Sequence, residues 1–177
     1  MPEIAVERIT QFTGRDLTEL CEAAEDAIKA GGGFGWLKPP PRHVMESYWR
    51  GVVLVPERHL FIGRLDGVVA GSAQLVRPTR NSEAQAHAAT LTSNFVAPWG
   101  RGHGLARLLT RTVETAARDA GYKILNLDVR ETQEAAIQLY ESFGYERWGR
   151  HPFYAMVDGK PVAGLFYFKH LDRDSGG

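Results

Sequence analysis

The chain has 177 residues, of which 44% are hydrophobic and 24% are charged, so it has the composition of a globular protein and enough length for one core. Lysine plus arginine and aspartate plus glutamate each number 21, and the resulting net charge of zero argues against a nucleic-acid or acidic-membrane partner. The single cysteine, Cys21, excludes an internal disulfide and is expected to be a small core residue.

The first half of the chain predicts a strand, two helices and a β-hairpin. In chain order these are a strand at 4–9, a helix from Thr13 or Asp16 to about 28, a helix at about 42–51 and a hairpin at 59–76. The glycines of GGGFG end the first helix, and the prolines of KPPPR delay the second. Asp66-Gly67 joins the two strands of the hairpin, because this dipeptide is favoured in tight turns.

The second half alternates strands with helices and closes on two more strands. In chain order these are a strand at 87–98, a helix at about 103–119, a strand at 123–129, a helix at about 132–143, and strands at 145–157 and 162–171. Hairpins around a central β-α-β-α-β unit predict an α+β class with a mixed sheet. We expect a single domain over 1–177, with a frayed tail at 172–177.

The stretch Arg101-Gly-His-Gly-Leu-Ala106 leads from a strand directly into a helix. The first N–H groups of a helix have no partner within the helix and carry the positive end of its dipole, so they can bind an anion that no side chain blocks. Gly102 and Gly104 remove the blocking side chains, and Arg101 adds a positive charge. The stretch does not fit the dinucleotide pattern G-x-G-x-x-G, and the P-loop ending G-K-[S/T] is absent. The residues alone leave two interpretations, a phosphate site or a tight turn that binds nothing.

The same six residues resemble the R/Q-x-x-G-x-G/A signature of the GNAT N-acetyltransferase superfamily. They follow Val96-Ala-Pro98, and residues 125–149 resemble that family's fifth strand, fourth helix and sixth strand, including its A-hydrophobic-x-L-Y-x-x-x-G-F/Y core. The resemblance implies a mixed, largely antiparallel sheet of six to seven strands with about four helices, splayed between the fourth and fifth strands. It also implies acetyl-CoA as the acyl donor in that splay, with no metal.

The resemblance further assigns roles to individual residues. Tyr140 is expected to protonate or hydrogen-bond the CoA sulfur, the alternative being a packed helix residue. Gln133 stands where the family often has an asparagine that contacts CoA. A backbone N–H near Val96 is expected to polarise the thioester carbonyl. The donor-binding residues so assigned are Phe95, Val96, Arg101, Gly102, His103, Gly104, Leu105, Ala106 and Gln133.

The acceptor side is less specified by the sequence. The base that takes the acceptor's proton is open among Glu83, His87, Asp128 and His151. We expect the acceptor pocket between residues 31–51 and the final hairpin, with aromatic walls, although ordinary core packing is the alternative. The aromatic residues concerned are Phe34, Trp36, Tyr48 and Trp49 on one side and Trp148, Phe153 and Tyr154 on the other.

These features together predict an N-acetyltransferase that acts on a primary amine of a small molecule or peptide. A non-catalytic acyl-CoA-binding or sensing domain and a structural domain with an empty loop are the alternatives. MPEIAVERIT lacks the apolar core of a signal peptide, and runs such as VVLV are too short to cross a membrane, so a cytoplasmic location is expected. The aromatic residues of GLFYF would permit a strand-mediated homodimer.

Overall fold

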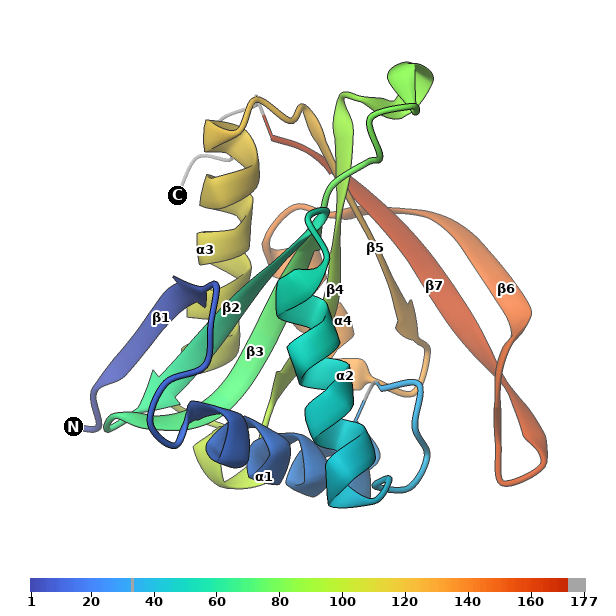
Figure 1. Ribbon diagram of the computed structural model, residues 1–177. Coiled ribbons are helices and arrows are strands. Elements are labelled where there is room, and N and C mark those ends of the chain that lie inside the picture. The colour runs from blue at the N-terminus through green and yellow to red at the C-terminus, as the bar shows by residue number, and fades with distance from the viewer. Residues whose placement is uncertain (33, 172–177) are drawn as a thin grey trace.

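Seven strands form one mixed sheet in the order β1-β2-β3-β4-β5-β7-β6, in a computed structural model that describes residues 1–32 and 34–171. Every neighbouring pair is antiparallel except β4 and β5, which are parallel (Figure 1). The strands are β1 (Ile4–Ile9), β2 (Arg58–Leu65), β3 (Val68–Val76), β4 (Ala88–Val96), β5 (Ile124–Arg130), β6 (Glu146–Val157) and β7 (Lys160–His170). The helices are α1 (Asp16–Lys29), α2 (Arg42–Leu54), α3 (Leu105–Asp119) and α4 (Glu134–Ser142), with short 3-10 helices at Glu83–Gln85 and Pro98–Gly100.

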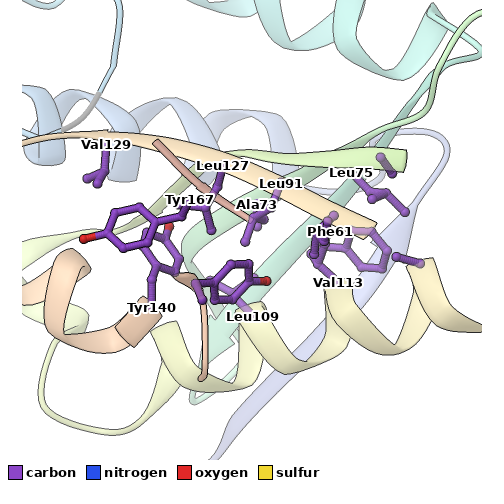
Figure 2. Close-up of a cluster of buried hydrophobic side chains, with 14 of the residues drawn as sticks. Phe61, Ala73, Leu75, Leu91, Leu109, Val113, Leu127, Val129, Tyr140 and Tyr167 are labelled. Atoms are coloured by element: carbon purple, nitrogen blue, oxygen red, sulfur yellow. The ribbon is translucent and has the colours of Figure 1, made fainter. Parts of the chain in front are cut away.

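Helices cover the sheet on both faces and divide the core into two clusters. On one face α1 and α2 bury residues such as Leu20, Ala24 and Trp49 against β2 to β4. Cys21 lies in this cluster as predicted, and burial raises the pKa of its thiol to about 11. On the other face Leu109 and Val113 of α3 pack beneath the sheet, as Figure 2 shows.

β4 and β5 separate soon after they begin. They pair only at Ala88, Ala89 and Thr90 of β4, and beyond these residues the two strands diverge. β4 is also irregular, because its register with β3 shifts near Ser93, whose φ is +52°. The predicted splay between the fourth and fifth strands is therefore confirmed, and it opens toward the carboxyl ends of both strands.

A buried ion pair ties α3 to β7 at the level where β4 and β5 still pair. Lys169 Nζ lies 2.9 and 3.1 Å from the two carboxylate oxygens of Glu114, and both residues are almost fully buried. The ammonium also lies 5.6 Å from the ring centroids of Phe143 and Tyr145. Removing one partner of such a buried pair leaves the other charge buried and unpaired, which destabilises the fold strongly. The Glu114–Lys169 pair therefore holds the two halves of the sheet together beside their short contact.

The sequence predicted the class and the element order correctly. The boundaries differ by a few residues: α2 continues to Leu54 and α3 begins at Leu105. β7, which contains GLFYF, is hydrogen-bonded to β5 on one edge and β6 on the other, so it has no free edge for a strand-mediated dimer. The frayed tail predicted at 172–177 lies outside the described residues.

Candidate functional site

The splay between β4 and β5 opens into a cleft of about 890 Å³. Five parts of the chain meet there: the end of β4, the glycine turn before α3, α4, the loop after α1, and the turn between β6 and β7. The lining residues are 27–32, 36, 37, 94–96, 100–102, 104–107, 130, 132–136, 139, 140, 157, 158 and 162. Of the residues that the sequence assigned to the donor and its chemistry, only His103 is not among them.

The glycine turn presents backbone N–H groups to the cleft. Gly102 and Gly104 have φ values of +85° and +83°, a conformation that residues with a β-carbon rarely adopt. Among the described residues no side chain caps the N-terminus of α3, so none of them supplies a side-chain partner for its first N–H groups. A β-carbon placed on Gly102 would meet nothing within 4 Å, which shows that the approach is open. Beside the turn, Arg101 Nε donates to the Val96 carbonyl over 3.3 Å.

Tyr140 of α4 reaches the cleft from the α3 face of the sheet. Its side chain is buried, as Figure 2 shows, among the core residues on that face. It packs edge-on against Tyr145, with 5.7 Å between ring centroids. Burial raises the pKa of Tyr140 to about 12, with a smaller lowering from the Asn94 amide and a smaller rise from the charge of Asp128. The phenol therefore keeps its proton at neutral pH and can act as an acid.

Asn94 is a cleft residue that sequence reasoning missed. Its Nδ2 donates to Thr110 Oγ1 over 3.0 Å, and Thr110 in turn donates to the Ala106 carbonyl. These two bonds fix the orientation of the amide and leave Asn94 Oδ1 buried without a partner among the described residues. The irregularity at Ser93 turns Asn94 toward α3, so simple strand alternation gave no signal for it.

Two side chains tie the far wall of the cleft to the loop that follows α1. Gln133 Nε2 donates to the Gly31 carbonyl over 2.7 Å, and Arg130, at the end of β5, donates to the Phe34 carbonyl. Gln133 has a second N–H and an amide oxygen besides the bond to Gly31. The residue that was expected to contact CoA therefore also positions the loop.

The aromatic residues expected around the acceptor pocket separate into two groups. Trp36 and Tyr48 are half-buried and meet edge-on, with 5.1 Å between ring centroids, and Trp36 lines the cleft. Phe34 and Trp49 instead pack around Phe95 in the α1–α2 core, so their prediction as pocket walls is wrong and the packing alternative holds. On the other side, Trp148 and Phe153 are exposed and Tyr154 is half-buried.

The four candidate bases lie in different places. Glu83 and His87 precede β4, at the end away from the cleft, and the nine residues of that strand span about 30 Å. His151 is on β6, with β7 between it and β5, and its Nδ1 accepts the Phe153 N–H over 3.0 Å. Asp128 is on β5, two residues past the last one that pairs with β4, so it lies on the splayed part of the strand. Of the four, Asp128 alone has a position beside the splay.

Within residues 1–32 and 34–171, no group of three or more histidine, cysteine, aspartate or glutamate side chains is arranged to hold a metal ion. No helix in the same residues has the length and apolar character needed to span a membrane.

Known proteins resemble this chain in sequence and in structure. A family model described as Acetyltransferase (GNAT) family matches residues 18–145. An uncharacterized N-acetyltransferase in the hisH-hisA intergenic region of Azospirillum brasilense is 67% identical over 133 residues, which is 75% of this chain and 79% of that protein.

Solved structures share the fold at lower sequence identity. An N-acetyltransferase from Staphylococcus aureus Mu50 has a TM-score of 0.81 at 20% identity, covering 96% of this chain and 99% of that one. The structure of yncA from Salmonella typhimurium with its cofactor acetyl-CoA has a TM-score of 0.75 at 18% identity, covering 98% and 96% of the two chains.

Proposed function

Because the chain belongs to the GNAT family of acetyltransferases and is an acyltransferase, we propose that it moves an acetyl group from acetyl-CoA to a primary amine of a small molecule or peptide. The transfer occurs by direct attack of the amine while both substrates are bound. The observation that carries this proposal is one cleft that holds an open helix N-terminus and a buried, protonated phenol.

The residues around the cleft fit a CoA thioester. The N–H groups of residues 102–106 bind the pyrophosphate at the N-terminus of α3, where Arg101 adds a positive charge. Phe95 and Val96 border the pantetheine, and Gln133 contacts it with the amide atoms not used for Gly31. His103 supplies only its backbone N–H, because the residue is exposed and does not line the cleft.

The chemistry needs a neutral amine, a polarised carbonyl and a proton for the sulfur. A lysine-like amine has a pKa of about 10.4 and is mostly protonated at neutral pH, so a base must accept its proton, and we assign this role to Asp128. The backbone N–H of Val96 polarises the thioester carbonyl. The amine nitrogen bonds to the acetyl carbon, the carbon–sulfur bond breaks, and the Tyr140 hydroxyl gives its proton to the sulfur.

We further propose a single catalytic domain over residues 1–177, a cytoplasmic location, and a small-molecule or peptide acceptor rather than a nucleic acid. The zero net charge supports the last of these.

Two measurements on the purified protein test the function. Thermal unfolding with acetyl-CoA at 100 times its dissociation constant should show about 2.7 kcal/mol of added stability. Consumption of acetyl-CoA should then appear with at least one member of a panel of primary amines. Binding without turnover of any amine would favour the acyl-CoA-sensing alternative, and no stabilisation at millimolar acetyl-CoA would overturn both.

A further inference from the structure

Within residues 1–32 and 34–171, no helix packs extensively against the outer face of β5, β7 and β6. α1 and α2 pack on β2, β3 and β4, and Figure 1 shows the β5–β7–β6 side of the sheet standing clear of them. Along β5, Leu127 and Val129 point into the α3-side core, so Asp128 between them points to this outer face. The carboxylate is therefore exposed on the open face, beside the splay in which Tyr140 lies.

Tyr154 reaches Asp128 across an intervening strand. The register of β6 with β7 shifts between His151 and Ala155, and this irregularity lets Tyr154 lie over β7. A β-carbon at Gly164 of β7 would overlap the Tyr154 ring, so the ring occupies the space that this glycine leaves. From there the Tyr154 hydroxyl donates to Asp128 Oδ2. An irregular strand and a glycine thus together bring a phenol from β6 to a carboxylate on β5.

Two more rings continue from Tyr154 along the open face. Phe166 lies opposite Asp128 in the β5–β7 register, and its ring centroid is 5.8 Å from that of Tyr154 and 5.4 Å from that of Trp148. The Trp148 side chain is 64% exposed, so core packing does not account for its place there. We call Tyr154, Phe166 and Trp148 the aromatic shelf.

Resting on the proposed function, we propose that the acceptor is a primary ammonium attached to an aromatic or apolar body, with the ammonium on Asp128 and the body on the aromatic shelf. The carboxylate complements the charge of the ammonium, and ring faces attract both cations and apolar groups. Two strand spacings separate β5 from β6, which puts Trp148 about 10 Å from Asp128. That distance suits an amine with one ring, such as phenethylamine.

Tyr154 is a positioning residue in this arrangement. Its hydroxyl holds the carboxylate on the open face, and its ring forms the end of the shelf nearest to the splay. Its contribution should therefore appear in the KM of the acceptor and not in the KM of acetyl-CoA.

The test compares phenethylamine, ethanolamine and spermidine as acceptors. We expect kcat/KM for phenethylamine to exceed that for each polar amine by about tenfold or more, the scale on which apolar pockets discriminate. Trp148→Ala should lower kcat/KM for phenethylamine about tenfold and so reduce its preference over the polar amines. Trp99→Ala, which truncates an exposed tryptophan outside the shelf, should preserve the preference.

Two variants test the polar part of the site. Asp128→Asn should lower kcat/KM for all three amines by about 100-fold, while acetyl-CoA still stabilises the protein. The control Asp119→Asn, at the exposed end of α3, should not lower kcat/KM. Tyr154→Phe should raise the KM of phenethylamine about tenfold with the KM of acetyl-CoA unchanged. Tyr122→Phe, which removes a hydroxyl bonded to Arg77, should change neither value.

Failure of the proposed acceptor site can be distinguished from failure of the proposed function. Acetyl-CoA turnover that favours spermidine or ethanolamine, or an Asp128→Asn variant as active as the parent, would overturn the aromatic-ammonium site and leave the acetyltransferase intact. Failure to bind acetyl-CoA at all would overturn both.

Discussion

The proposed donor side of the cleft and the proposed acceptor side differ in the groups that they offer to a substrate. The donor side, formed by residues 94–107 and α4, offers chiefly the backbone N–H groups of consecutive residues at a helix N-terminus. The proposed acceptor side combines the loop after α1 and the β6–β7 turn, which line the cleft, with Asp128 and Tyr154 on the open face beside it, so its side chains come from segments far apart in the chain. A site built from backbone depends on local sequence, whereas a site built from side chains depends on how distant segments pack. We therefore expect the donor to be the substrate shared by proteins of this fold, and the acceptor to be the substrate that distinguishes one such protein from another.

The largest effect is expected at Tyr140, where the two sides meet. Tyr140→Phe should lower kcat about 100-fold because it removes the proton donor, with both KM values little changed. Tyr145→Phe removes a neighbouring buried hydroxyl that has no partner among the described residues, so its kcat should stay close to that of the parent. Equal rates for Tyr140→Phe and the parent would exclude Tyr140 as the acid.

The pH profile of the parent enzyme gives a second readout of the same residue. An acid works only while it is protonated, and burial raises the pKa of Tyr140 to about 12. The rate should therefore not fall as pH rises through 10, where an ordinary phenol would lose its proton. A fall in kcat centred near pH 10 would contradict the buried-acid assignment.

A smaller effect is expected on the donor side from Gly102→Ala. The methyl group would stand where the phosphate approaches, so acetyl-CoA affinity should fall about tenfold, measured by titration calorimetry. The left-handed backbone adds a cost of about 1–2 kcal/mol in folding stability.

Gly121→Ala separates the two contributions. Gly121 has a φ of +91° and open space around it, as Gly102 does, but it follows α3 at the end away from the cleft. We expect equal loss of stability in the two variants and reduced acetyl-CoA affinity only in Gly102→Ala. Equal affinities in both would show that the turn does not bind phosphate.

The smallest effect is expected from Gln133→Ala, which tests whether Gln133 contributes to binding of both the donor and the acceptor. Its bond to the Gly31 carbonyl positions the loop after α1, and the residue lines the cleft. Loss of one hydrogen bond on each side, worth about 1 kcal/mol, should raise both KM values about fivefold in steady-state assays. Gln138→Ala on the exposed face of α4 should raise neither. A change in the acceptor KM alone would assign Gln133 to the loop only.

The sequence predicted the element order and the glycine turn that leads into α3 because both depend on local chemistry. Asp66-Gly67 and Asp158-Gly159 specify turns by backbone conformation, and all four residues have positive φ in the structure. The glycine turn is similarly local, since six consecutive residues determine the backbone at the start of α3.

The acceptor side could not be predicted in the same way. Helical and strand periodicity shows that an aromatic residue is buried, but not whether it borders a pocket or fills the core, which is why the sequence left both alternatives open for Trp49, a core residue in the structure. The contact between Tyr154 and Asp128 requires a register shift in β6, and Asn94 reaches the cleft through another in β4. One signal was present: Gly164 interrupts the apolar run VAGLFYF, and a glycine inside a strand often marks a close approach.

The short contact between β4 and β5 gives the molecule a mechanical property. The two half-sheets join over three residue pairs, and the Glu114–Lys169 pair fixes them at that end. At the open end they are bridged through the bonds of Gln133 and Arg130 to the loop after α1. The core on the α3 face contains residues of both half-sheets, such as Leu91 of β4 and Leu127 of β5, so packing beneath the sheet also joins them. A donor bound in the cleft would contact both half-sheets, so the substrate would add a further, reversible connection between them at the open end of the sheet.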